Sequence, residues 1–326
     1  NGSITVNASG GSGNFSYAWP AGISATGNSA TNLSGGTYVI TVTDNTRGCV
    51  VSTSVTLNNT PAVTATFNVS DVLCNGQSNG SITAVPATGT APFSFSVNGG
   101  TPSSNLTASN LPAGTYSIFL SDVNGCTFSN PAVVVGEPDV LTLSATPTAP
   151  ACFDGNNGSI SLSANGGTGT YEYRLTGGTY SNNPVISNLN AGIYSVQVRD
   201  ANGCETTLND VIVTQPSPLM IQLDNTTPEY CDRADGTATV SASGGTGNLS
   251  FNWSDGQSNP TATGLAAGAY SVTATDANGC TASISATVGF VAAHTLNVSQ
   301  SDENCDQGNG SITVNASGGS GNFSYA

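Results

Sequence analysis

The sequence contains no lysine and little charge of either sign. Of its 326 residues 7% are charged, and 19 acidic residues face four basic ones, Arg47, Arg174, Arg199 and Arg233. Nucleic-acid binding needs clustered lysine and arginine side chains that neutralise phosphates. The formal net charge of -15 therefore excludes nucleic acid as a partner.

Long apolar runs and catalytic motifs are also missing. No stretch approaches the roughly 20 apolar residues that span a bilayer, so we expect no membrane span in these residues. The sequence has no metal-binding histidine pair and no Walker loop, and its one histidine, His294, has no catalytic pattern around it. A lone histidine is more often structural than catalytic. We therefore expect that the protein is not an enzyme.

The sequence repeats on two scales. Residues 1–18, NGSITVNASGGSGNFSYA, recur without substitution at residues 309–326, which predicts a window on a longer polypeptide with a period of 308 residues. Four shorter repeats of about 77 residues make up this period. Two sets of cysteines mark their register, namely Cys74, Cys152, Cys231 and Cys305, and Cys49, Cys126, Cys204 and Cys280.

Each repeat contains two alternating segments that predict half-buried strands. The first is NGSITV (1–6), NGSITA (79–84), NGSISL (157–162) or DGTATV (235–240), and a glycine-rich turn follows it. The second is aromatic and reads FSYAW (15–19), FSFSV (93–97), YEYRL (171–175) or LSFNW (249–253). We expect Trp19 and Trp253 to lie in the core of their modules, with Val97 and Leu175 at the same position in the other two.

Two further landmarks close each repeat. NLSGGTY (32–38), NLPAGTY (110–116), NLNAGIY (188–194) and GLAAGAY (264–270) are similar to the tyrosine corner of immunoglobulin-like sandwiches. They predict core positions for Tyr38, Tyr116, Tyr194 and Tyr270. DNTRGC, DVNGC and two copies of DANGC are typical of hairpin turns, in which Asp caps the turn and Asn and Gly tolerate positive φ.

About seven short strands per repeat predict an all-β protein of tandem immunoglobulin-like β-sandwich modules arranged as an extended fibre. A β-solenoid is the structural alternative, but its coils repeat at roughly 20 to 30 residues. Pro61, Pro138 and Pro216 mark junctions, and Gly289 and Phe290 mark the fourth. The predicted modules are residues 1–60 (partial, second strand onward), 61–137, 138–215, 216–290 and 291–326 (the start of the next).

The turn aspartates Asp44, Asp122, Asp200 and Asp276 have two interpretations. The first is that they bind calcium at the module junctions, because carboxylates are ligands that calcium prefers. Calcium is the one cofactor that we consider. A hairpin turn needs the same residues, and one carboxylate per turn is few for calcium. A cation would also relieve repulsion if acidic residues beside the first cysteine approach the next module's turn, namely Asp71, Asp154, Asp232, Asp235 and Asp306.

Eight evenly spaced cysteines predict disulfides in an oxidising compartment, and zinc is improbable without CxxC pairs. In an immunoglobulin topology, Cys74 and Cys126 lie at opposite ends of one sandwich, on the order of 20 Å apart. Pairing across the junctions, Cys74 with Cys204 and Cys152 with Cys280, is therefore one hypothesis. Cys126 would then pair with the equivalent of Cys305 in the preceding period. Pairing within modules, such as Cys74 with Cys126, stays open because the strand assignment can be wrong by one element.

The combined pattern C-x-G-x-x-x-G-S-I, GG-x-G, an aromatic strand, L-x-A-G-x-Y and D-x-N-G-C resembles the SprB-type repeat of Bacteroidota cell-surface proteins. The resemblance covers nearly the whole chain, and the departures are DNTRGC in the first repeat and a missing GG in the second. It implies surface display and adhesion, with export by the type IX secretion route.

From these patterns we expect a disulfide-stapled stalk or fibre of an extracellular cell-surface adhesin or filament. The alternatives are a self-assembling structural filament and a glycan-binding repeat module. The expected partners are neighbouring repeats of the same chain, identical chains in a filament, and an unidentified surface or glycan receptor.

Overall fold

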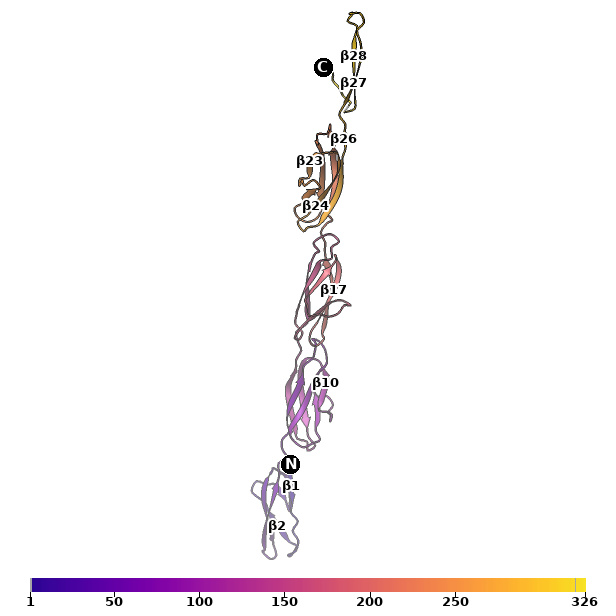
Figure 1. Ribbon diagram of the computed structural model, residues 1–326. Helices are drawn as coiled ribbons and strands as arrows, with labels where there is room; N and C mark the ends of the chain where they lie inside the picture. The colour runs from indigo at the N-terminus through magenta and orange to yellow at the C-terminus, as the bar shows by residue number, and fades with distance from the viewer. Residues whose placement is uncertain (1, 320) are drawn as a thin grey trace. The chain divides into compact units, whose positions relative to one another are not determined.

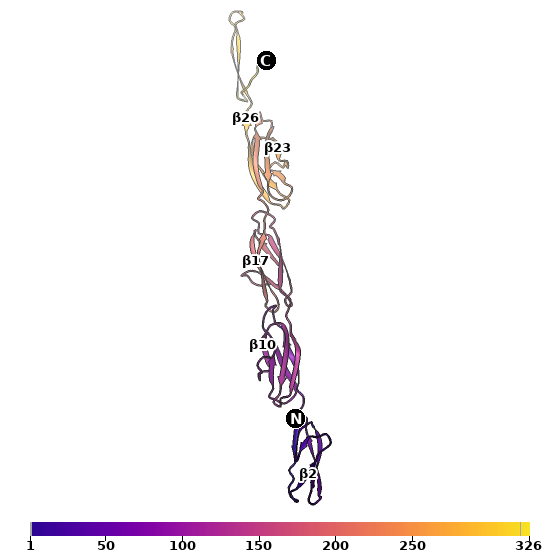
Figure 2. The same ribbon diagram turned by 180° about the vertical axis from the view of Figure 1, so that it is seen from behind.

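The computed structural model describes residues 2–319 and 321–326, and within these residues the backbone forms strands and turns without a helix. The chain divides into two compact units, Asn1–Pro138 and Asp139–Ala326. Each unit contains β-sandwiches that follow the predicted repeats, seen from opposite sides in Figures 1 and 2.

The second sandwich shows the strand order of a complete repeat (label β10 in Figure 1). One antiparallel sheet has the order β10-β8-β7, and the other has the order β12-β11-β9. The first, second and fourth strands thus face the third, fifth and sixth, as in immunoglobulin-like sandwiches. The strands are β7 (Thr64–Ser70), β8 (Gly80–Thr88), β9 (Ser94–Val97), β10 (Thr107–Leu111), β11 (Gly114–Ser121) and β12 (Thr127–Val135).

The second unit contains two further sandwiches with this order. Their sheets are β13-β14-β16 with β15-β17-β18, and β19-β21-β23 with β22-β24-β25. In the second of them, a short strand β20 between β19 and β21 pairs in parallel with β26, which spans the predicted boundary at residue 290. The strands are β13 (Thr142–Thr148), β14 (Gly158–Asn165), β15 (Glu172–Leu175), β16 (Val185–Leu189), β17 (Gly192–Arg199), β18 (Glu205–Val213), β19 (Met220–Thr227), β20 (Glu229–Tyr230), β21 (Gly236–Ser243), β22 (Ser250–Trp253), β23 (Thr261–Leu265), β24 (Gly268–Thr275), β25 (Thr281–Val288) and β26 (Phe290–Val291).

Residues 2–60 and 291–319 form partial repeats with the same strand arrangement. In the first sandwich the sheets are β1-β4-β3 and β2-β5-β6, and β1 corresponds to β8, the second strand of the complete repeat. Near the other end, β27 and β28 form an antiparallel hairpin that corresponds to β7 and β8. The strands are β1 (Gly2–Thr5), β2 (Phe15–Ala18), β3 (Ala25–Thr26), β4 (Ser29–Leu33), β5 (Gly36–Asp44), β6 (Val50–Leu57), β27 (Thr295–Ser301) and β28 (Ser311–Ser317).

The predicted number of about seven strands is one too high for the second and third sandwiches. The segment between their third and fourth strands pairs through isolated bridges, Phe95 with Ser103 and Tyr173 with Ser181. In the second sandwich the backbone N–H groups of this segment bond to nearby side chains instead. Ser103 Oγ accepts the N–H of Asn105, and Asn105 Oδ1 accepts the N–H of Thr107. Such side-chain bonds offer the backbone an alternative to a sheet ladder.

The core follows the alternation of the sequence. In β8, Gly80, Ile82 and Ala84 are buried while the residues between them are half-buried. The glycine is required by close approach, because a Cβ atom there would lie 2.6 Å from Val135 Cγ1 and 2.9 Å from the carbonyl oxygen of Leu111. The NGS segment therefore brings the second strand against the fourth and sixth strands.

Each predicted tyrosine corner is present. The Tyr116 hydroxyl donates to the carbonyl oxygen of Pro112 at 2.7 Å, four residues upstream. The same bond is made by Tyr38 to Ser34 (2.6 Å), Tyr194 to Asn190 (2.9 Å) and Tyr270 to Ala266 (3.1 Å).

Replacing Tyr116 by Phe removes this bond and keeps the buried ring. We expect Y116F to lose about 1 kcal/mol of unfolding free energy, the usual net contribution of one hydrogen bond. Native-state hydrogen exchange of amides in β11 and β12 measures this sandwich separately from the others. Unchanged exchange would show that the corner bond contributes nothing to stability.

Candidate functional site at the disulfide junction

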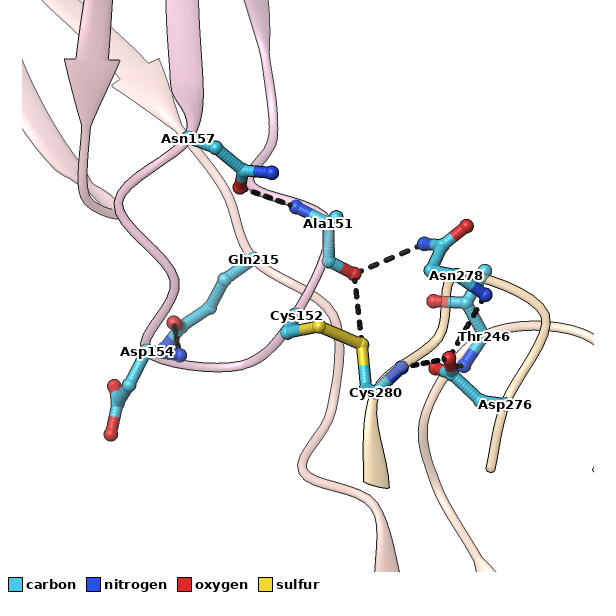
Figure 3. The surroundings of a disulfide bond; sticks show 9 residues. All are labelled: Ala151, Cys152, Asp154, Asn157, Gln215, Thr246, Asp276, Asn278 and Cys280. Atoms are coloured by element: carbon cyan, nitrogen blue, oxygen red, sulfur yellow. Dashed lines mark hydrogen bonds between the residues drawn. A yellow bond between two sulfur atoms is a disulfide. The ribbon is translucent and has the colours of Figure 1, made fainter. Parts of the chain in front are cut away.

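Two sandwiches of the second unit are joined covalently (Figure 3). Cys152 lies in the turn between β13 and β14, and Cys280 lies in the turn between β24 and β25. Their Cα atoms are 5.7 Å apart, within the range of roughly 4.4 to 6.8 Å found in disulfides. The bond therefore links the first turn of one sandwich to the last turn of the next.

Side chains from the repeat motifs shape the turn around Cys152 (Figure 3). Asn157, of the NGS segment, accepts the N–H of Ala151 at 2.9 Å. Gln215, which precedes Pro216 at the junction, accepts the N–H of Asp154 at 2.9 Å. The second sandwich has the same two bonds, from Leu73 to Asn79 (3.0 Å) and from Gly76 to Glu137 (2.8 Å).

The turn that carries Cys280 is organised by a buried carboxylate. Asp276 Oδ1 accepts the N–H groups of Asn278 (2.9 Å) and Cys280 (2.8 Å), and Oδ2 accepts that of Thr246 (2.8 Å). A Cβ atom on Gly245 would lie 2.9 Å from this Oδ2 atom. The GG-x-G motif thus leaves room for the carboxylate that ties two loops together and orients the cysteine.

The other sandwiches repeat this arrangement. The carboxylate accepts an N–H group from the glycine-rich loop in three further bonds, namely Ser12 to Asp44 (2.9 Å), Thr90 to Asp122 (3.0 Å) and Thr168 to Asp200 (2.8 Å). These aspartates are 4 to 7% exposed.

A hydrogen bond beside the disulfide crosses the same junction. Asn278 Nδ2 donates to the carbonyl oxygen of Ala151 at 3.0 Å, and Cys280 Sγ lies 3.5 Å from that oxygen (Figure 3). Of the Asn and Gly that the sequence offered for positive φ in this turn, Gly279 adopts it, at 84°, and Asn278 does not. The Asn instead binds the neighbouring sandwich.

The comparisons with known proteins agree with the repeat pattern. A family model described as SprB repeat matches residues 1–22, 66–102, 144–180, 223–258 and 297–326. In the three complete sandwiches these segments run from the first strand to just beyond the aromatic strand. The chain belongs to the SprB repeat family. A search of curated proteins finds no match.

Solved structures similar to this SprB repeat chain contain immunoglobulin domains. Immunoglobulin domains 1–5 of Sidekick-1 give a TM-score of 0.32 at 12% identity, over 89% of this chain and 76% of that one. The N-terminal eight domains of Down Syndrome Cell Adhesion Molecule give 0.30 at 13% identity, over 87% and 44%. The fold assignment rests on the sheet topology described above.

The junction confirms part of the disulfide prediction for the SprB repeats. Cys152 pairs with Cys280 across the junction, as the cross-junction hypothesis has it. Cys74 and Cys204 are also disulfide-bonded. Pairing of Cys74 with Cys126 is wrong, because Cys126 is a free thiol. Cys49, Cys231 and Cys305 are free thiols too, and their pairing with cysteines of adjacent periods stays a prediction.

Calcium binding at Asp44, Asp122, Asp200 and Asp276 stays a prediction. Each carboxylate accepts the N–H group of the residue two positions later in its own turn, as the hairpin-turn interpretation requires. Figure 3 shows the Asp154 carboxylate turned away from Asp276, on the other side of the disulfide. The predicted approach of these two like charges is therefore wrong at this junction, because the Asp276 carboxylate is directed into its own turn.

The predicted aromatic core positions differ in burial. Trp253 is 2% exposed and donates its indole N–H to the carbonyl oxygen of Asn259 at 2.9 Å. Trp19 is half-buried and donates to the carbonyl oxygen of Gly27 at 3.2 Å. Tyr116 is buried, whereas Tyr38, Tyr194 and Tyr270 are half-buried and pack against their cores.

One cluster of the third sandwich was not foreseen from the sequence. The guanidinium groups of Arg174 and Arg199 lie 4.1 and 4.2 Å from the centre of the Tyr180 ring. Arg199 also pairs with Glu172 at 2.6 Å. Burial raises the pKa of the Tyr180 phenol. The Tyr180 ring and Glu172 hold the two guanidinium groups within the sandwich, so two of the four arginines have a structural role. Among the described residues, the buried Tyr180 hydroxyl has no hydrogen-bond partner.

Three turn carboxylates, those of Asp44, Asp122 and Asp276, are held in their charged form. Burial alone would raise the pKa of Asp276 and of Asp122, but backbone N–H donors outweigh burial and leave the pKa below its usual value. For Asp44 the hydroxyl group of Ser12 is the largest cause of a lowered pKa. A lowered pKa means that the ionised group stabilises the folded state.

Acid is therefore expected to destabilise the turn that presents Cys280. With a folded pKa below the unfolded value of about 3.9, the contribution of Asp276 is complete above that value and is lost as the pH falls through the folded pKa. We expect Asp276→Asn to lower the urea midpoint of this sandwich at about pH 6 and to flatten its dependence on acid. Asp224→Asn, an exposed acid of the same sandwich, is the control. Equal acid sensitivity of D276N and the unmodified chain would contradict this role.

Proposed function

We propose that the chain is a structural repeat region of a long extracellular cell-surface adhesin. In this proposal disulfide-linked sandwiches form a stalk, or extended fibre, that holds an attachment site away from the cell. Surface display in Bacteroidota and export by the type IX route are part of the same proposal, and they come from membership of the SprB repeat family.

The observation that carries the proposal is the Cys152–Cys280 bond between neighbouring sandwiches. A disulfide inside a module would stabilise that module, whereas this one limits rotation and separation at the junction. The bond from Asn278 to Ala151 joins the same two turns, and the bond from Asp154 to Gln215 ties the Cys152 turn to the segment that leads into the next sandwich. Resistance to bending is the property that a stalk needs.

An extracellular location is supported by the chemistry of the chain. Disulfides persist in oxidising compartments and are rare in the reducing cytosol. Among the described residues there is no helix with the length and apolarity needed to cross a bilayer. We infer that any attachment to the cell is made by other means than a helix of the described residues.

We also propose that the repeats are not enzymatic. The polar residues that recur in each repeat have assigned structural tasks: Asn157 and Asp276 cap turns, and Tyr116 closes a corner. A catalytic site is one specific arrangement of reactive groups. These sandwiches instead repeat the same set of structural polar residues.

A glycan-binding module is the alternative of a different class. Sugar rings stack on exposed aromatic faces, so the exposure of the two tryptophans discriminates between the roles. Trp253 is 2% exposed and packs in a core with Val240 and Val272. Its burial favours the structural role for that repeat.

Electron microscopy of single purified chains tests the proposal. We expect beaded threads whose bending angles are narrow when oxidised and broad after reduction or in the variant C152S/C280S. The variant C231S, which changes a free thiol in the same unit, should bend like the unmodified chain. Compact particles, or bending that reduction does not change, would contradict a stapled stalk.

A further inference from the structure

The third sandwich (label β17 in Figure 1) has an Asn-Gly pair, Asn165 and Gly166, where β14 meets the glycine-rich turn. In such a pair the backbone nitrogen of the glycine can attack the side-chain amide carbon of the asparagine and expel ammonia. Glycine favours this attack because it has no Cβ atom to obstruct it. The sequence contains ten Asn-Gly pairs, at Asn1, Asn75, Asn79, Asn98, Asn124, Asn157, Asn165, Asn202, Asn278 and Asn309. Their surroundings decide which of them can react.

At Asn165 the attacking nitrogen already lies against the amide that it would attack. The Gly166 N–H group donates to Oδ1 of Asn165 at 2.9 Å. The amide carbon Cγ is one C=O bond of about 1.23 Å from this oxygen, so it lies within roughly 4 Å of the nitrogen. This is close to the separation of about 3 to 3.5 Å from which reacting atoms combine. Asn165 is exposed, so water reaches the pair.

Neighbouring contacts hold the pair in this arrangement. The carbonyl oxygen of Asn165 accepts the Thr142 hydroxyl group at 3.1 Å, which fixes the peptide group that contains the Gly166 nitrogen. The carbonyl oxygen of Gly166 accepts the Tyr171 hydroxyl group at 2.7 Å. A Cβ atom at Gly166 would overlap the carbonyl oxygen of Val140. The reacting groups are therefore preorganised by the fold.

The other Asn-Gly pairs of the described residues have a reacting group engaged elsewhere. In four of them the glycine N–H group donates to another residue, namely Gly76 to Glu137 (2.8 Å), Gly125 to Asp122 (3.1 Å), Gly203 to Asp200 (3.0 Å) and Gly279 to Asp276 (3.1 Å). In four more the amide oxygen accepts a distant N–H group, namely Asn79 from Leu73 (3.0 Å), Asn98 from Ser117 (2.8 Å), Asn157 from Ala151 (2.9 Å) and Asn309 from Asn304 (2.9 Å). These bonds keep the nitrogen and the amide carbon apart.

The fold does not require an asparagine at position 165. The glycine-rich turns of the other sandwiches have Ser9, Thr88 and Ser243 at this position. Gly244, which follows Ser243, has the same φ of 80° as Gly166. The reactive pair is thus a property of the third sandwich alone, and serine is a substitute that the same turn accepts.

We propose that Asn165 is a modification site at which the folded chain deamidates without an enzyme. The Gly166 nitrogen bonds to Cγ of Asn165, its proton passes through water to the side-chain nitrogen, and the Cγ–N bond breaks to release ammonia. The product is a five-membered succinimide ring. One water molecule then opens the ring at either of its two carbonyl carbons and yields aspartate or isoaspartate. The reaction is independent of the stalk proposed above.

Isoaspartate at this position is expected to loosen the glycine-rich turn, because it lengthens the backbone by one methylene group. The turn holds its place through the N–H group of Gly167, which donates to the carbonyl oxygen of Asp139 at 2.9 Å. The next N–H group, of Thr168, donates to the Asp200 carboxylate at 2.8 Å, and that carboxylate accepts the N–H of Cys204 at 2.9 Å. The modification therefore reaches the turn that presents a disulfide-bonded cysteine.

Ageing of the full chain tests the site. The purified folded chain is kept at mildly alkaline pH, digested with pepsin in acid to stop the reaction, and analysed by mass spectrometry with fragmentation that separates aspartate from isoaspartate. We expect Asn165 to convert at least about tenfold faster than Asn98 and Asn278, because orientation of reacting groups is worth factors of this size or more. In chain unfolded by urea and reductant, the three positions should convert at similar rates.

Two variants serve as controls. Asn165→Ser should remove the product and keep the circular dichroism of the unmodified chain, whereas Asn98→Ser should leave conversion at Asn165 unchanged. Conversion at Asn98 as fast as at Asn165 in the folded chain would overturn the proposal. So would conversion at Asn165 that folding suppresses as strongly as it does at Asn98.

Hydrogen exchange measures the effect on the turn. The Thr168 amide should exchange faster in the isoaspartate fraction than in the unmodified chain. The variant N165D has the added charge without the longer backbone, and it should exchange like the unmodified chain. Equal exchange in all three forms would overturn the expected loosening.

Discussion

Pulling the chain from its two ends is expected to leave the segment between Cys152 and Cys280 unextended under oxidising conditions. The disulfide fixes the Cα atoms of these residues 5.7 Å apart, although 128 positions of sequence separate them. Force enters along β13, crosses the sulfur atoms and leaves along β25. At about 3.3 to 3.6 Å per extended residue, the withheld contour length is roughly 420 to 460 Å.

Optical tweezers can measure this length with the chain in its C74S/C204S background, which leaves Cys152–Cys280 as the bond under study. Adding a reductant, or adding the changes C152S/C280S, should release the withheld length as further unfolding steps. The change C231S in the same background should release none of it. Full extension of the oxidised background would show that Cys152 and Cys280 are not joined.

Replacing Trp253 by Ala is expected to have the largest effect of any single core substitution. Its side chain is 2% exposed and lies among Val240, Leu265 and Val272. Truncation leaves a cavity and removes the hydrogen bond to Asn259, and such changes cost about 3 to 5 kcal/mol. Small domains are stable by a margin of about this size or little more, so the sandwich of residues 216–290 should be largely unfolded at moderate temperature.

The chain contains its own control for this experiment. Trp19 occupies the same position in the first sandwich, is half-buried, and should lose less stability on replacement by Ala. Hydrogen exchange in β24 and β25, compared with β17 and β18 of the neighbouring sandwich, localises the effect. Equal losses at Trp19 and Trp253 would contradict the assigned burial.

The elements that sequence predicts well here depend on local pattern. Alternation placed Ile82 and Phe95 in the core, the L-x-x-G-x-Y spacing placed the Tyr116 corner, and the cysteines fell in the first and last turns. Each of these follows from residues within one strand or one turn. These elements can be predicted because the spacing of side chains that are close in sequence determines them.

What sequence did not predict depends on how one sandwich meets the next. The bond from Asn278 to Ala151 joins residues 127 positions apart, and no local pattern distinguishes it from a turn residue. The orientation of Asp154 away from Asp276 was also not predicted, because it too depends on how two sandwiches meet. The lower burial of Trp19 relative to Trp253 was not predicted either, because the two residues share the same aromatic spacing.

The disulfide loop of the second unit also changes what a cut in the backbone does. Three of the four arginines, Arg174, Arg199 and Arg233, lie between Cys152 and Cys280, and the sequence has no lysine. A trypsin-like protease that cleaves at one of them opens a nick without separating the two pieces, because the sulfur atoms still join them. Shedding of the distal part of the molecule would require a second event, reduction or another cut outside the loop.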